Sequence, residues 1–279
     1  MSGRRRRAVS SGRRVALAVA SLTLMSSTAW AADPIQLHAA GSLRAAMTEM
    51  GRLFEARDGT RVETRFGASG LLRDALVGGE RGEVFASANM DHPIALAQAG
   101  RSGSVVLFAR NRMCALARPG LGVDTSSVVR RMLDPQIKLG TSTPGADPSG
   151  DYAVEVFRRI EAALPGSFAT LNAKALRLTG NREAPSPPSD RSIYAQLIEQ
   201  GAADLFLTYC TNARAAVAEL EGAQVVELPP KLAVGADYGL TVLKDASPAA
   251  YRFVLLVLSP EGQAVLAKSG FTTPFTPTP

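Results

Sequence analysis

Small hydroxyl residues stand at several points where a strand pattern gives way to a helix pattern. Ser42 follows "IQLHAAG", Ser69 lies in "RFGASGLLRDAL", and Ser149 lies in "DPSGDYAVEVF". Such a serine can be a nucleophile, a helix cap or part of an anion site, because a helix start offers unpaired N–H groups and a positive dipole end. Each serine alone is expected to be a cap, but their repetition favours an anion site in which no full positive charge is needed.

The nucleophile interpretation of Ser69 fits the sequence poorly. A hydrolase nucleophile elbow needs G-x-S-x-G, whereas residues 67–71 are GASGL. The general base should be a histidine late in the chain, but the two histidines, His38 and His92, lie early and do not complete a Ser, Asp, His order. A serine hydrolase that uses Ser69 is therefore kept only as the alternative from a different functional class, and we expect the protein not to be an enzyme.

The residues that usually hold metals or cofactors are isolated. His38, His92, Cys114 and Cys210 show no metal-ligand spacing, and no P-loop or G-x-G-x-x-G follows a strand. We expect no cofactor and no resident metal. In an exported protein the even cysteine count permits one disulfide between Cys114 and Cys210, and it equally permits two separate buried thiols.

Residues 1–31 have the three regions of a secretory signal peptide. Six arginines precede an apolar run from Val15 to Met25, and Ala29-Trp30-Ala31 forms an A-x-A cleavage site. The apolar run is shorter than the roughly 20 residues that a membrane-spanning helix needs. We expect cleavage before Ala32 and a periplasmic location; Arg13-Arg14 leaves both the general and the twin-arginine export routes open.

The basic character of the chain comes from this leader. Residues 1–31 hold six arginines and no acid, so the other residues carry 25 Lys and Arg against 25 Asp and Glu, although the whole chain has a formal charge of +6. A neutral mature protein has no electrostatic reason to bind nucleic acid or an anionic membrane. We therefore expect neither as a partner.

Strand and helix patterns alternate along the rest of the chain. The expected strands lie at 35–40, 61–66, 83–88, 138–143, 174–180 and 204–210, and the expected helices after Ser42, after Ser69, near Asp91 and at 150–164, 193–201 and 248–268. Ser42 and Ser69 are expected to cap their helices. Alternation of this kind predicts mostly parallel sheets flanked by helices.

Two segments are interpreted as crossings between two lobes. The apolar run 105–117, broken by polar residues at 110–112, is too long for an ordinary strand, and 238–246 has the pattern of a return. The predicted fold is a two-lobed α/β protein, with lobe 1 at 32–108 and 238–279 and lobe 2 at 109–237. A ligand in such a fold sits in the cleft, where strand ends meet helix starts.

Over most of its mature length the sequence resembles the periplasmic molybdate-binding proteins of ABC transporters. Seven stretches match in family order: "AAGSLRAAMTEMGRLFE", "FGASGLLRDAL", "GERGEVFASANMDHP", "VLFARNRMCALARPG", "DPSGDYAVEVF", "GAADLFLTYCTNA" and "LSPEGQAVLAKSGF". The resemblance implies a class II periplasmic binding protein that closes on a tetrahedral oxyanion and delivers it to a membrane permease. It also implies a monomer.

The resemblance implies five ligand-binding residues. Ser42 and Ser69 would use hydroxyl and backbone N–H groups, Ser149 and Arg191 would use backbone N–H groups, and Tyr209 would use its phenol. A fully deprotonated oxyanion such as molybdate only accepts hydrogen bonds, so a pocket of neutral donors suits it and avoids burying a countercharge.

Two departures from the family leave the ligand open. Arg191 stands beside a proline-rich insertion at 181–190, and an inward guanidinium would suit a larger or differently charged ligand, whereas a solvent-facing one would leave only its backbone in use. Gly41 and Gly70 replace bulkier residues and are expected to widen the pocket. Sulfate, tungstate and an organic or metal-chelate anion therefore remain alternatives to molybdate.

The resemblance also bears on the cysteines. It places Cys114 on the strand that enters lobe 2 and Cys210 at the end of "DLFLTYC" in the same lobe. If neighbouring strands bring their Cα atoms within about 7 Å, export would oxidise the pair to a disulfide.

Overall fold

A computed structural model describes residues 1, 3, 33–183 and 191–274 of the protein. The predicted signal peptide, except for residues 1 and 3, and most of the 181–190 insertion lie outside the described residues. Within them no helix is both long enough and apolar enough to cross a membrane.

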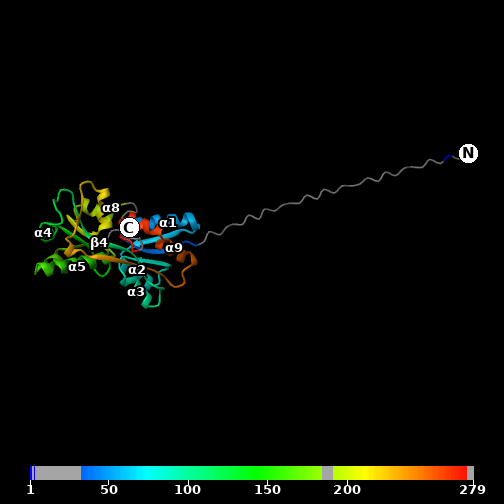
Figure 1. The fold of residues 1–279 in the computed structure, drawn as a ribbon, viewed down its shortest axis with the longest axis horizontal. Coiled ribbons are helices and arrows are strands. Elements are labelled where there is room, and N and C mark those ends of the chain that lie inside the picture. The colour runs from blue at the N-terminus through cyan, green and yellow to red at the C-terminus, as the bar shows by residue number, and fades with distance from the viewer. Residues whose placement is uncertain (2, 4–32, 184–190, 275–279) are drawn as a thin grey trace. The chain divides into compact units, whose positions relative to one another are not determined.

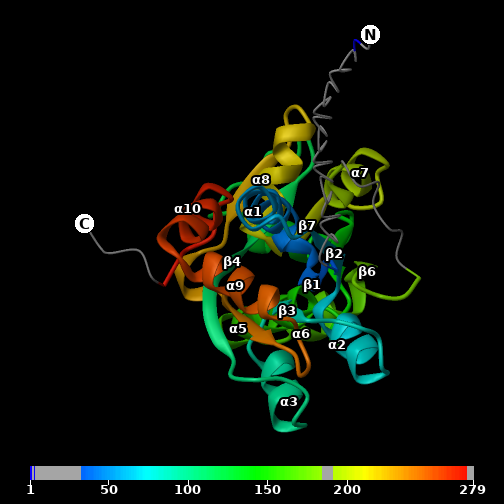
Figure 2. The ribbon, with the colours of Figure 1, turned by 90° about the vertical axis from the view of Figure 1, so that its right-hand side faces the viewer.

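The structure confirms the predicted alternation of strands and helices in two lobes (Figures 1 and 2). The strands are β1 (Ile35–Ala40), β2 (Val62–Gly67), β3 (Val84–Ser87), β4 (Val106–Ala117), β5 (Leu139–Ser142), β6 (Leu176–Thr179), β7 (Leu205–Tyr209), β8 (Gln224–Glu227) and β9 (Gly235–Val242). The helices are α1 (Arg44–Asp58), α2 (Ser69–Val77), α3 (Asp91–Gln98), α4 (Val128–Leu133), α5 (Pro148–Ala163), α6 (Ser167–Lys174), α7 (Ile193–Glu199), α8 (Cys210–Glu219), α9 (Pro248–Leu258) and α10 (Pro260–Lys268). Short 3-10 turns lie at Gly41–Leu43 and Pro230–Leu232.

Four of these elements were not predicted: α4, α6, α8 and β8. The helix α8 begins at Cys210, directly after the last residue of β7, so no turn residue separates the two patterns. The other three are only four to eight residues long. Windows this short show too little of either period to identify an element.

The strands of the described residues order as β2-β1-β3-β9-β4-β7-β5-β6, with β8 also paired to β4. β1 is parallel to β2 and β3, and β5 is parallel to β6 and β7. The strands β4 and β9 run antiparallel to each other in the middle of this order. Figure 1 shows β4 between α4 and α5 on one side and α1, α2 and α3 on the other.

The long segment 105–117 is the crossing that its length suggested. Its first half, Val106–Arg112, pairs with β9, and its second half, Met113–Ala117, pairs with β7 and β8. The polar break lies where the strand passes between the lobes: Asn111 points inward, while Arg110 pairs with Asp237 at 2.9 Å on the surface. The boundaries near 108 and 237 stay predictions, because both crossing strands contribute residues to both lobes.

One large apolar core runs through both lobes. It includes Met47 of α1, Phe108 of β4, Phe157 of α5 and Phe253 of α9, all with 0% exposure. Burying each such side chain stabilises the fold by about 1.5–3 kcal/mol. Phe253 also meets Phe54 edge-on at 5.5 Å between ring centroids, which fixes α1 and hence the turn that carries Ser42.

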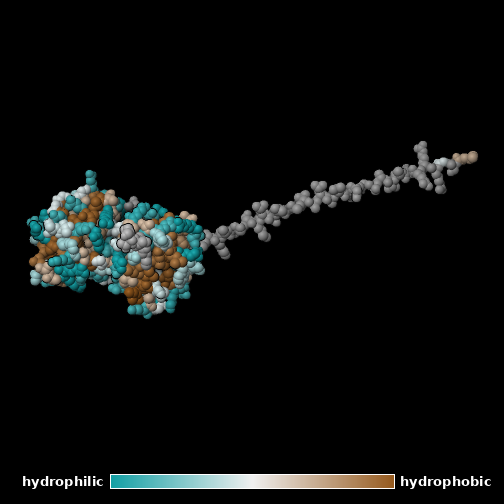
Figure 3. All heavy atoms as spheres, viewed as in Figure 1, coloured by the Kyte–Doolittle hydropathy of each residue, from teal (hydrophilic) through white to brown (hydrophobic). Residues whose placement is uncertain are grey.

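The surface is mixed. On the face shown in Figure 3, hydrophilic residues predominate, and one apolar area lies over the region where Figure 1 places α2 and α3. Val77 of α2 and Ile94 of α3 are among the exposed large apolar residues.

Candidate functional site: the cleft between the lobes

A cleft of about 1690 Å³ is lined by residues of both lobes. The first lobe contributes the turn before α1, the loop before α2 and the end of β3, and the second contributes the loop after β6 and the starts of α7 and α8. Ser42, Arg191 and Tyr209 line this cleft directly. Ser69 and Ser149 are each 1% exposed, beside lining residues Ala68 and Asp147.

The two first-lobe serines do not cap their helices, so that prediction was wrong. Ser42 lies in the 3-10 turn, and its hydroxyl is 2.9 Å from the phenol oxygen of Tyr238. Ser69 is the first residue of α2 rather than its N-cap, and its hydroxyl accepts from the Ala88 backbone N–H at 3.1 Å. Each hydroxyl keeps hydrogen-bonding capacity beyond the contact described.

The start of α5 is capped by a residue that the sequence analysis missed. Asp147 is the N-cap, Pro148 is the first helical residue, and the Ser149 N–H donates to Asp147 Oδ1 at 3.0 Å. The backbone donor expected to serve a ligand is therefore bonded to a carboxylate of the protein itself. Burial raises the pKa of Asp147 to about 6, although the hydrogen bonds from Ser149 and Ser142 oppose this shift.

Two hydroxyls at this part of the site are buried without a partner. Among the described residues, neither Ser149 Oγ nor Tyr209 OH has a hydrogen-bond partner. Tyr209 is 2% exposed at the end of β7, and its ring packs edge-on against Tyr152 and Tyr238 at 6.2 and 5.7 Å between centroids. Burial raises the pKa of Tyr209 well above its ordinary value, so the phenol stays a donor.

A hydrogen-bonded network joins the hinge to the second lobe beside this tyrosine. The Asn111 side-chain amide on β4 donates to Tyr238 OH at 3.3 Å and to Thr211 Oγ1 of α8 at 2.9 Å. Tyr238 in turn contacts Ser42. No local sequence pattern indicates this network, because its members are far apart in the chain.

Cys114 and Cys210 are joined by a disulfide, with their Cα atoms 4.9 Å apart. Cys114 lies on β4, and Cys210 is the first residue of α8, next to Tyr209. The bond ties the crossing strand β4 to the residue that directly follows Tyr209.

The Arg191 guanidinium turns toward acidic side chains. Its Nη2 lies 3.3 Å from Glu199 Oε2 and its Nε 3.7 Å from Glu219 Oε2, and its side chain is 42% exposed. The Ser192 N–H also donates to both carboxylate oxygens of Glu219 at 3.0 Å. These contacts favour the interpretation in which the Arg191 side chain does not bind the ligand.

Gly70 does not widen the pocket as predicted. Its N–H donates to the Ala146 carbonyl of the other lobe at 3.0 Å, and a Cβ at this position would lie 2.6 Å from that oxygen. Glycine here permits the lobes to touch. Gly41, by contrast, lines the cleft, and a Cβ there would meet nothing closer than 4.0 Å.

The two histidines lie apart from Ser69. His38 Nε2 is 2.8 Å from Glu80 Oε1, and His92 Nδ1 is 3.0 Å from Arg73 Nη1. Burial lowers the pKa of His92 to about 4, so its ring is neutral at pH 7. In the described part of the chain no group of three or more His, Cys, Asp or Glu side chains could hold a metal ion.

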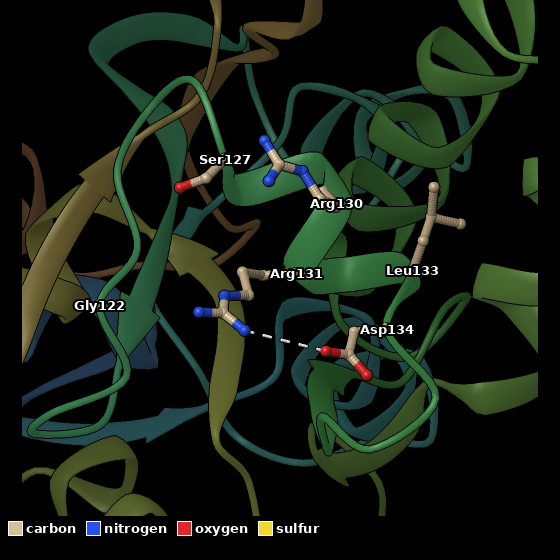
Figure 4. Close-up of a pocket in the computed structure, with 6 residues that line it drawn as sticks. All are labelled: Gly122, Ser127, Arg130, Arg131, Leu133 and Asp134. Carbon is tan, nitrogen blue, oxygen red and sulfur yellow. Dashed lines mark ion pairs between the residues drawn. The ribbon is translucent and has the colours of Figure 1, made fainter.

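A second hollow, of about 570 Å³, lies beside the six-residue helix α4 (Figure 4). Its lining residues are Gly122, Ser127, Arg130, Arg131, Leu133 and Asp134. Arg131 and Asp134 form an ion pair at 3.8 Å. None of the five predicted ligand-binding residues belongs to this hollow.

Comparison with known proteins agrees with the two-lobed fold and its cleft. Residues 35–272 match the family described as bacterial extracellular solute-binding protein. The molybdate-binding protein of Mycobacterium bovis is 28% identical over 95% of this chain and 98% of its own length.

Two solved structures share the fold. The periplasmic molybdate-binding protein of Azotobacter vinelandii superposes with a TM-score of 0.70 at 19% identity, covering 86% of this chain and 99% of that one. The sulfate-binding protein of Mycobacterium tuberculosis superposes with a TM-score of 0.71 at 17% identity, covering 87% and 88%. The fold is therefore that of a class II periplasmic binding protein.

The chain belongs to the bacterial extracellular solute-binding proteins. Within them it is similar to the molybdate-binding proteins, as its sequence motifs predicted. The relatives named above are binding proteins, and the family to which the chain belongs is described as one of extracellular solute-binding proteins.

Proposed function

We propose that this protein is an exported binding protein that delivers an oxyanion, molybdate or tungstate in the first instance, to the permease of an ABC importer. The proposal includes removal of residues 1–31 and action as a monomer in the periplasm. Ser42, Ser69, Ser149, Arg191 and Tyr209 are its proposed ligand-binding residues.

The observation that carries this proposal is the pair of buried hydroxyls, Ser149 Oγ and Tyr209 OH, that have no hydrogen-bond partner within the part of the chain that the structure describes. Leaving a buried polar group unpaired costs about 1–3 kcal/mol. An oxyanion in the cleft would accept from both groups and remove that cost. Because hydrogen bonds to a charged acceptor are stronger than neutral ones, the same two groups would contribute strongly to binding.

A larger anion is the second candidate, and the size of the cleft favours it. The cleft of about 1690 Å³ far exceeds what one tetrahedral oxyanion fills, and Arg44, Arg65 and Arg182 are among its lining residues. An organic phosphate would use the same hydroxyl donors for its phosphate group and the remaining volume for its organic part. The similarity in fold to a sulfate-binding protein keeps sulfate in the comparison.

Isothermal titration of residues 32–279 distinguishes these ligands. Molybdate, tungstate, sulfate, phosphate and a sugar phosphate are titrated in turn, and we expect molybdate and tungstate to bind most tightly. The variant Tyr209→Phe tests the site, because it keeps the ring packing and removes one hydrogen-bond donor. It should lose about 1.5–3 kcal/mol of binding free energy. If only sulfate or only the sugar phosphate bound tightly, that anion would replace molybdate as the proposed ligand. If no anion bound, the proposal would be overturned.

A further inference from the structure

The start of α5 already holds an anion of the protein's own. Asp147 Oδ1 accepts from the Ser149 N–H at 3.0 Å, and the nearby Ser142 side chain also acts to lower the pKa of this carboxyl. Asp147 also lines the cleft. A ligand drawn to the dipole of α5 therefore meets a carboxylate group in the same place.

Asp147 lies close to the backbone of Gly180. A Cβ on Gly180 would lie 2.5 Å from the Asp147 Cβ and 2.9 Å from Oδ2, so only glycine fits beside the carboxyl. Gly180 has a φ of 78°, which glycine adopts freely. The backbone at Gly180 therefore lies directly against the Asp147 side chain.

The groups that face Asp147 do not neutralise it. In the described residues the titratable groups that interact with it are Asp151 on α5, Tyr194 on α7, Tyr209 on β7 and Tyr238 on β9. One is an acid, and burial raises the pKa of each of the three phenols, which therefore remain uncharged at neutral pH. No cation is among these groups, and Arg44, Arg65 and Arg182, which line the same cleft, are not among the groups that shift the pKa of Asp147. An ionised Asp147 and an anion bound beside it would therefore repel each other.

Ser149 Oγ and Tyr209 OH mark where the ligand would lie. Both are buried and without a partner in the described residues, Ser149 is bonded to Asp147 through its N–H, and Tyr209 interacts electrostatically with the same carboxyl. An anion that accepts from the Ser149 hydroxyl would lie close to the Asp147 carboxyl, because Asp147 is bonded to the backbone of Ser149.

Given the proposed function, we infer that the cleft binds its oxyanion together with one proton, which is shared between Asp147 and the ligand. The proton converts a contact between two anions into an O–H···O hydrogen bond. With molybdate or sulfate, which carry no proton at neutral pH, Asp147 takes one proton from solvent and donates it to the ligand. With hydrogen phosphate the ligand brings the proton, and the ionised Asp147 accepts from it.

The pH dependence has a definite sign. Burial raises the pKa of the unliganded Asp147 to about 6. Above pH 6 the carboxyl is therefore ionised in a growing fraction of the molecules, and these must take up a proton when molybdate binds. Each proton taken up weakens the affinity about tenfold per pH unit in that range. Molybdate affinity should therefore fall as pH rises above 6.

The test is titration of residues 32–279 with molybdate in buffers of different ionisation enthalpy. At pH 7.5 we expect an uptake of about one proton, and between pH 6.5 and 8.5 a loss of affinity of about 100-fold. Asp147→Asn keeps the N-cap, because asparagine caps as well as aspartate. It should abolish proton uptake, flatten the pH profile and bind molybdate at pH 8.5 at least tenfold more tightly than the natural protein.

The matched control is Asp151→Asn, four residues further along the same helix. The pKa of Asp151 is also raised, and burial is the main cause. Unlike Asp147, this carboxyl accepts from the Gly145 N–H and does not line the cleft. The control should keep the proton uptake.

The outcomes separate the inference from the proposed function. Molybdate binding with no proton uptake and a flat pH profile would overturn the shared proton and leave the proposed function standing. Uptake that survives in Asp147→Asn but disappears in Asp151→Asn would overturn the assignment to Asp147. If no oxyanion binds at any pH, the proposed function fails and this inference fails with it.

Discussion

The two lobes present the same kind of element to the cleft, a helix start after a strand, but they prepare it differently. In the first lobe, α2 begins without a side-chain cap, and the Gly70 N–H donates to the opposite lobe. In the second lobe, α5 begins with Asp147, whose carboxyl binds the Ser149 N–H. A serine at a helix start therefore does not by itself make an anion site, because the residue before it decides which N–H groups are free.

The largest expected effect on ligand binding comes from a substitution at the start of α2, which has no side-chain cap. A Cβ at Gly70 would lie 2.6 Å from the Ala146 carbonyl oxygen and 2.9 Å from that of Gly145, both backbone atoms of the other lobe. Gly70→Ala should therefore hold the lobes apart and weaken molybdate binding by about 3 kcal/mol, or roughly 100-fold. Titration of the variant beside Gly41→Ala measures this effect, since a Cβ at Gly41 meets nothing closer than 4.0 Å. Equal losses in both variants would contradict it.

Asp147, which caps the start of α5, should make the stability of the unliganded protein depend on pH. The pKa of Asp147 is raised to about 6 from 3.8, so between these values the native state binds more protons than the unfolded chain. The free energy of unfolding should then contain about 3 kcal/mol that is present below pH 4 and lost as pH rises through 6. Urea unfolding from pH 4 to 7.5 should show this component in the natural protein and not in Asp147→Asn.

His92 offers a comparison within the same measurement, because its pKa is lowered in the folded protein whereas that of Asp147 is raised. Its pKa is lowered to about 4, mainly by burial, so its contribution to stability is lost as pH falls from 6.5 toward 4. The two groups oppose each other in the natural protein. Asp147→Asn should therefore show a steeper loss of stability in acid than the natural protein does, and an unchanged profile would contradict the assignment.

The two serines should respond differently to alanine. Ser69→Ala leaves the Ala88 N–H without its acceptor at 3.1 Å and should lower the free energy of unfolding by about 1–2 kcal/mol. Ser149→Ala removes a buried hydroxyl that has no partner in the described residues and should leave stability within about 0.5 kcal/mol. Urea unfolding of both variants without ligand is the measurement. A larger loss for Ser149→Ala would show that its hydroxyl is already satisfied.

The smallest effect is expected at Arg191. Its guanidinium is half-exposed and paired with Glu199 and Glu219, so Arg191→Ala should change molybdate affinity by less than about 1 kcal/mol. A loss of 2–5 kcal/mol, poorly restored by lysine, would instead show that the guanidinium binds the ligand.

The sequence predicted the fold well, because apolar periodicity is a local property. The long crossing at 105–117 and the helix at 150–164 were recognisable from the residues themselves, and their observed bounds differ by only one or two residues. The elements that were missed are short or follow another element without a turn.

The site was harder to predict, because its details depend on contacts between distant segments. The bond from Gly70 to Ala146 and the network of Ser42, Tyr238 and Asn111 join residues that no local pattern connects. Asp147 is the exception. An aspartate followed by a proline at 148 is a recognisable helix start, and this signal could have placed the cap two residues before Ser149.

The two crossing strands also determine how the molecule can open. β4 and β9 stay hydrogen-bonded side by side from Val106 to Arg112, so rotation of one lobe must twist both strands as a unit. The pairing shifts at a single place, between Leu107 and Ala109. Opening of the cleft would therefore deform a paired two-stranded connection that has one irregular position, rather than change the course of a single loop.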